Sequence, residues 1–138
     1  MKPITQEMIK IYKINDFDFM GYDIKQKESL SFHHLIVPHR HCKEQGLGEG
    51  YLIWNGAVLV KKTSHDYLHI IEKVDFDAFS AVTSEMIDMN IKGRLDIENL
   101  RYIKDILLSF EREHDHDQNK NGKLLIKREY THNRFNWE

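Results

Sequence analysis

Two consecutive segments in the second half of the chain carry apolar residues at helical spacing, and this pattern constrains the fold more than any other feature. A break at Gly93 separates the two sets, which are Phe76, Phe79, Val82, Met86 and Met89, then Ile97, Leu100, Ile103, Leu107 and Phe110. Side chains three or four positions apart lie on one face of a helix. The pattern therefore predicts two amphipathic helices whose apolar stripes form part of the core.

The length and composition of the chain are typical of one globular domain. It has 138 residues, of which 41% are hydrophobic and 30% are charged. This is enough to bury a core but too few for two independent cores. We expect a single domain over residues 1 to 138, with an extended arm at residues 1 to 29, a helical part at 73 to 114 and a tail at 115 to 138.

Charge and cysteine content narrow the classes of function. The net charge of −2 gives no electrostatic reason by itself to expect nucleic-acid binding. Cys42 is the only cysteine, so an internal disulfide and a thiolate zinc site are excluded, and any metal must be held by His, Asp or Glu. Neither a bilayer-spanning apolar run nor a signal peptide is evident, so we expect a cytoplasmic protein without a membrane partner.

The first half of the chain predicts two strands and a helix. Residues 30 to 37 are rich in β-favouring side chains and are stopped by Pro38, and residues 57 to 61 form a second short apolar run. The glycine-bearing stretch between them, residues 38 to 56, is too long for a tight turn and predicts a functional loop. Thr63 or Ser64 is a candidate N-cap for a helix that follows.

Histidines are concentrated in the same region. His33 and His34 are adjacent near the end of the first predicted strand, and His65 and His69 are four residues apart on the predicted helix. The helical pair therefore shares one face, as two ligands of one divalent ion require. Neighbours on a regular strand point to opposite faces, so His33 and His34 can address one site only if the strand twists or ends there.

The order of these elements resembles the HNH nuclease family, whose ββα-metal (His-Me) finger has this layout. The matching stretches are "FHHLIVP", "NGAVLV" and "HDYLH". Twenty residues separate His34 from Asn55, nine separate Asn55 from His65, and three separate His65 from His69. The resemblance covers residues 30 to 72, and the all-histidine form is most similar to the bacterial colicin DNases. It implies an α+β fold in which the finger packs against the C-terminal amphipathic helices.

The resemblance also implies roles for individual residues. His33, His65 and His69 would hold one divalent metal ion, His34 would be the general base, and Asn55 would brace the loop and orient His34. Arg40 and Lys62 are candidate contacts to the DNA substrate. The expected activity is metal-dependent hydrolysis of DNA phosphodiester bonds. A histidine in place of the acidic ligand of many family members leaves the ion open among zinc, nickel, magnesium and manganese.

Two alternatives remain at this point. A finger that keeps its metal only as a structural staple would bind nucleic acid or protein without cutting it. A metalloprotease would use Asp66 within "HDYLH", in the position where the zincin motif has glutamate, but no separate third ligand is evident for it.

Overall fold

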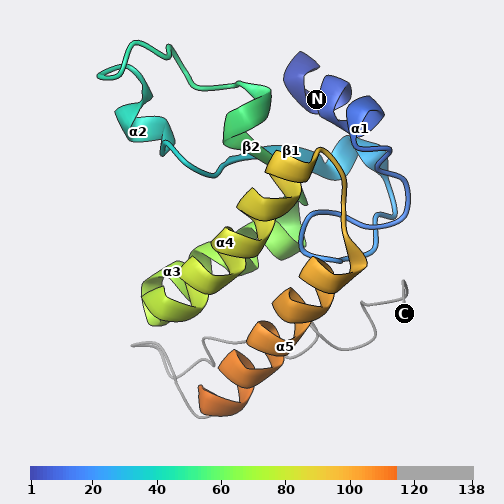
Figure 1. Ribbon diagram of the computed structural model, residues 1–138, viewed down its shortest axis with the longest axis vertical. Helices are drawn as coiled ribbons and strands as arrows, with labels where there is room; N and C mark the ends of the chain where they lie inside the picture. Colours follow the sequence, from blue (N-terminus) through green and yellow to red (C-terminus); the bar gives the residue numbers. More distant parts are fainter. Residues whose placement is uncertain (115–138) are drawn as a thin grey trace.

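The computed structural model describes residues 1 to 114, and the predicted tail at 115 to 138 lies outside the described residues. The protein has an α+β fold, as predicted, with helices around a two-stranded antiparallel sheet (Figure 1). In chain order the elements are α1 (Pro3–Ile11), a 3₁₀ turn (Lys27–Ser29), β1 (Leu30–His34), α2 (His39–Cys42), a 3₁₀ turn (Ile53–Asn55), β2 (Gly56–Val60), a π-helical segment (Lys61–His65), α3 (Asp66–Val74), α4 (Phe76–Lys92) and α5 (Ile97–Glu113).

The two strands pair along their full length, with Leu30 opposite Val60 and His34 opposite Gly56. Strand β1 ends three residues earlier than predicted. The reason is that the backbone N–H groups of Ile36 and Val37 donate to the Asn55 side chain, at 3.0 and 2.7 Å, rather than to a neighbouring strand. His34 is therefore the last residue of the strand, and the chain turns away immediately after it.

The N-terminal segment contains helix α1, so the prediction of an extended arm over residues 1 to 29 is wrong for Pro3–Ile11. Helix α1 has Pro3 in its first turn, where the missing N–H costs no hydrogen bond. Met8 and Thr5 are buried on its inner side, and α1 packs against both strands. Because this short helix depends on contacts with distant residues, its own sequence pattern gives only a weak signal.

The prediction that Thr63 or Ser64 caps the helix after the second strand, which is α3, is also wrong. The chain passes from the π-helical segment directly into α3, with no side-chain cap at either start. Ser64 is instead buried and its hydroxyl donates to the carboxylate of Asp18. Asp18 also accepts the backbone N–H groups of Met20, Tyr22 and Val60. The loop after α1 is thereby tied to the start of the histidine-bearing helix.

The two predicted amphipathic helices are confirmed as α4 and α5. Asp75 and Asp96 cap their N-termini by accepting backbone N–H groups, and Gly93 ends α4 in the left-handed conformation with φ of 74°. The helices pack against each other (Figure 1). Phe76, the first residue of the predicted stripe, is 64% exposed. The buried residues of the stripes join one core with those of α1, α3 and both strands; they are Val82, Met86, Met89, Leu100, Ile103, Leu107 and Phe110. No helix within residues 1 to 114 has the length and apolar character needed to cross a membrane.

Candidate metal centre

Three histidines from two separate parts of the chain converge on one point. His33, His65 and His69 each direct a ring nitrogen so that the three nitrogen atoms lie within 4.8 Å of one another. The Nδ1 of His33 lies 3.2 Å from the Nε2 of His65. His33 is buried at the end of β1, His65 is the last residue of the π-helical segment, and His69 lies one turn further along, in α3.

The donor set fits a divalent metal ion. Two imidazole nitrogens bound to one zinc ion at about 2.0 to 2.1 Å in tetrahedral geometry lie about 3.3 Å apart. The 3.2 Å separation of His33 and His65 matches this value, and a nitrogen of His69 lies within 4.8 Å of both. Three imidazoles leave coordination positions open, which is typical of catalytic rather than structural sites. The residues present therefore fit such an ion.

Ser31 orients His65. The Ser31 hydroxyl donates to the carbonyl of Leu59, at 3.2 Å, so its oxygen is free to accept the Nδ1–H of His65, at 2.9 Å. Protonation of Nδ1 leaves the lone pair of the neutral ring on Nε2, the nitrogen that faces His33. On α3, the carboxylate of Glu72 lies 3.5 Å from Nδ1 of His69 and can orient that ring in the same way. Neither residue was a candidate from sequence, because neither belongs to the motif.

Replacing Ser31 with alanine should lower metal affinity by about 10- to 100-fold, because His65 loses the partner that fixes its tautomer. The affinity of metal-stripped protein for zinc, measured by competition with a chelator, tests this. Ser29→Ala is the matched control, because the Ser29 hydroxyl donates to a local carbonyl, that of Gln26, and not to a histidine of the cluster. An unchanged affinity in Ser31→Ala would mean that packing alone orients His65.

Two imidazoles of the cluster, those of His33 and His65, have lowered pKa values that keep them neutral in the metal-free protein. Burial and the nearby rings of His65 and His69 lower the pKa of His33 to about 3. Burial and the ring of His69 lower the pKa of His65 to about 4. Metal binding needs deprotonated ligands, so both rings are prepared to bind a cation at neutral pH.

These shifts predict that metal-free protein loses stability as the pH falls below 6.5. In that range the unfolded chain protonates His33 and His65 at their ordinary pKa, whereas the folded chain does not, so protons favour unfolding. Denaturant midpoints between pH 7 and pH 4.5 measure the effect. His65→Asn, which can still donate to Ser31, should reduce the proton uptake on unfolding by about one. Equal pH dependence in the two proteins would contradict the depressed pKa of His65.

His34 lies in the same pocket but outside the cluster. The pocket has a volume of about 490 Å³, and its lining includes His33, His34, His65 and His69. The Nε2 of His34 lies 2.7 Å from the carbonyl oxygen of Glu49. A carbonyl only accepts, so Nε2 carries the proton and the lone pair of the neutral ring is on Nδ1. Burial lowers the pKa of His34 and so favours the neutral ring. The hydrogen bond to the Glu49 carbonyl acts in the opposite direction but is the smaller of the two effects.

Asn55 holds the loop that follows β1. Its side-chain oxygen accepts the N–H groups of Ile36 and Val37, and its amide donates to the carbonyls of Val37 and Gly50, at 3.0 and 3.3 Å. Gly50 has a φ of 76°, and a Cβ there would collide with the Sγ of Cys42 and crowd the ring of His34. The buried amide thus connects both ends of the loop that carries the Glu49 carbonyl.

Asn55→Ala should reduce the free energy of unfolding by about 2 to 4 kcal/mol, because several buried backbone groups lose their partner. Urea denaturation measures the loss. Asn15→Ala is the control, since the Asn15 side chain makes an exposed bond with Lys27 and should change stability by less than about 0.5 kcal/mol. A similar small change in Asn55→Ala would show that the loop finds other partners.

The two candidate substrate contacts are placed differently. Arg40, in α2, lines the histidine pocket, whereas Lys62, in the π-helical segment, is exposed and does not line it. His39, which was not a candidate site residue, also lines the pocket, and its ring centroid lies 5.0 Å from that of His34. This position could not be expected from sequence, because α2, which carries His39, lies in the stretch 38 to 56 that was predicted as a loop.

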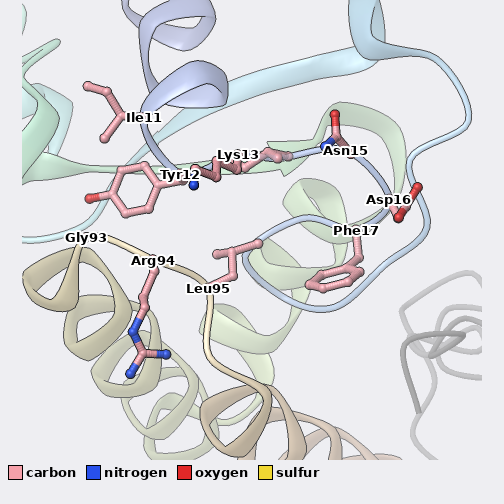
Figure 2. Close-up of a pocket in the computed structure, with 10 residues that line it drawn as sticks. Ile11, Tyr12, Lys13, Asn15, Asp16, Phe17, Gly93, Arg94 and Leu95 are labelled. Atoms are coloured by element: carbon pink, nitrogen blue, oxygen red, sulfur yellow. The ribbon is translucent and has the colours of Figure 1, made fainter.

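A separate hollow of about 520 Å³ lies between the end of α1 and the α4–α5 turn (Figure 2). It is lined by residues 11 to 17 and 93 to 95 and shares none of them with the histidine pocket. Its Arg94 side chain donates to Asp96 at 2.8 Å. We assign no chemistry to this hollow.

Comparison with known proteins found no matching family model, no similar curated protein and no similar solved structure.

Proposed function

We propose that this protein is a metal-dependent endonuclease of the HNH type, which hydrolyses DNA phosphodiester bonds, with residues 30 to 72 acting as a ββα-metal finger. The observation that carries the proposal is the placement of four histidines around one pocket. Three of them present nitrogen donors to one point, and the fourth, His34, lines the same pocket with its Nε2 hydrogen-bonded to the Glu49 carbonyl. A purely structural metal site has no use for that fourth group.

His34 is the general base in this account. With its Nε2–H held by the Glu49 carbonyl, Nδ1 is available to remove a proton from a water molecule. The oxygen of that water forms a bond to phosphorus as the bond from phosphorus to the 3′ oxygen breaks. The products are a 5′ phosphate and, after protonation from solvent, a 3′ hydroxyl.

The other residues bind and position. His33, His65 and His69 would hold the ion, and the chemistry that a divalent ion supplies is stabilisation of negative charge on the phosphate and on the leaving oxygen. Arg40 provides a guanidinium at the pocket wall that can bind a non-bridging phosphate oxygen. Asn55 donates to the carbonyls of Val37 and Gly50 and so fixes the loop whose Glu49 carbonyl orients His34.

Plasmid nicking tests the proposal. Purified protein is stripped of metal and then supplied separately with magnesium, manganese, nickel or zinc. We expect conversion of supercoiled to open-circular plasmid with at least one ion and none without. Stoichiometric metal binding without nicking by any ion would favour the alternative of a metal-stapled finger that binds but does not cut.

A further inference from the structure

Another hollow, of about 640 Å³, adjoins the histidine pocket; we call it the second hollow, and it is distinct from the one at the end of α1. The two cavities share Phe32 and Tyr51 in their linings, so these side chains form the wall between them. The second hollow is built from the start of α1, from β1 and from Lys61 at the start of the π-helical segment. Neither the candidate ligands His33, His65 and His69 nor His34 or Asn55 is among the residues that line it.

The charge of this hollow is locally positive although the chain is acidic overall. Lys2 and Lys61 line it, and Glu28 is the one carboxylate among the lining residues within the described residues 1 to 114. Lys2 and Lys61 are both exposed, so their ammonium groups remain available to a ligand. A pair of lysines that can both reach one cavity is suited to a phosphate group.

Tyr51 fixes the position of one of these cations. The Nζ of Lys2 lies 4.5 Å from the centre of the Tyr51 ring, in a cation–π contact. The same ring packs at 5.2 Å from His34 and 5.2 Å from Phe32, measured between ring centroids. Lys2 therefore lies at the boundary of the two hollows, and the Tyr51 ring contacts both Lys2 and His34, the proposed base.

We propose that this hollow is a subsite for the nucleotide next to the cleaved bond, where Lys2 and Lys61 bind its backbone phosphate. This inference rests on the proposed function and extends it, because it makes the preferred substrate a polynucleotide that spans both hollows. A small phosphodiester fills only the histidine pocket and does not reach the two lysines.

A binding measurement tests the subsite without requiring catalysis. The probe is a fluorescein-labelled 12-nucleotide single-stranded DNA, mixed with full-length protein in EDTA, and anisotropy is recorded at several salt concentrations. Lys2→Ala/Lys61→Ala should bind more weakly than wild type, and the slope of log affinity against log salt should be shallower by about 1.4, or about 0.7 per lost contact. Lys10→Ala/Lys25→Ala removes the same charge from exposed positions outside both hollows and should keep the wild-type slope.

A cleavage measurement separates failure of the subsite from failure of the proposed function. With metal, the Lys2→Ala/Lys61→Ala protein should hydrolyse bis(p-nitrophenyl) phosphate like wild type but show a raised KM for DNA. Equal DNA binding by the two double variants would overturn the subsite, as would equal loss of activity on the small and the large substrate. A wild-type protein that cleaves neither substrate would refute the nuclease, while the anisotropy result would still decide whether the lysines bind DNA.

Discussion

His34→Ala should lower the rate of plasmid nicking by about 10²- to 10⁴-fold, the range that a positioned general base contributes. The ring of His34 is half-buried at the end of β1. Among the described residues, its hydrogen bond to the Glu49 carbonyl is its one polar contact with the loop between β1 and β2. The fold and the three-histidine cluster should therefore remain. The rate is measured under single-turnover conditions at saturating metal, together with metal affinity and the denaturant midpoint.

The control for His34→Ala is His41→Ala. His41 is a partly exposed residue of α2 that pairs with Glu44 and does not line the pocket. It should nick at the wild-type rate within about twofold. If His34→Ala nicks as fast as His41→Ala, His34 is not the base. If His34→Ala instead unfolds, the histidine has a structural role, and the catalytic assignment loses its support.

Removal of a metal ligand has the second large expected effect. His69→Ala should lower the affinity for zinc by more than about 100-fold, which exceeds the effect expected for loss of a residue such as Ser31 that only orients a ligand. The same change should abolish nicking at stoichiometric metal. His69 is the best position for this test because its side chain is 51% exposed, so its loss should cost little stability. Calorimetric titration with zinc measures the affinity and the stoichiometry.

A second group of potential ligands provides the control for that experiment. Asp75, Glu113 and His114 also bring donor atoms within 4.8 Å of one another, with His114 Nε2 at 3.2 Å from a carboxylate oxygen of Asp75. His114→Ala should leave zinc stoichiometry and nicking unchanged. If His114→Ala abolished zinc binding and His69→Ala did not, the metal centre would lie at the end of α5 and the account of the histidine pocket would fail.

The parts of the fold that could be predicted from sequence are those with a local, repeated pattern. Helices α4 and α5 were predicted from apolar spacing, and the predicted break at Gly93 is where α4 ends. Helix α1 was missed because its stability comes from burial of residues such as Met8 against the strands. That contact depends on the tertiary fold and leaves little trace in a short segment.

The candidate site likewise contains residues that local spacing could predict and residues that depend on the tertiary fold. His65 and His69 could be placed together because helical geometry alone brings positions four apart onto one face. Their meeting with His33 depends on the antiparallel pairing of β1 and β2, which spacing suggests but does not prove. Ser31, Glu72 and Tyr51 could not be predicted, because their roles arise from side-chain contacts that no motif encodes.

Asp18 is a further residue that sequence alone could not assign. It lies 46 positions from Ser64 in the chain, yet its buried carboxylate accepts the Ser64 hydroxyl next to His65. A π-helical segment inside or beside a helix often marks a functional site, and here it delivers His65 to the cluster. The prediction of an extended arm over residues 1 to 29 gave no indication of this role for Asp18.

The most direct test of the central claim is a titration of nicking activity against metal equivalents. Metal-stripped protein at a fixed concentration well above the dissociation constant receives increasing amounts of the ion that best supports activity. We predict that the nicking rate rises linearly and reaches its plateau at one equivalent per chain, because one ion on His33, His65 and His69 is needed. Full activity of the stripped protein, or saturation of metal binding at one equivalent with no nicking, would contradict the account.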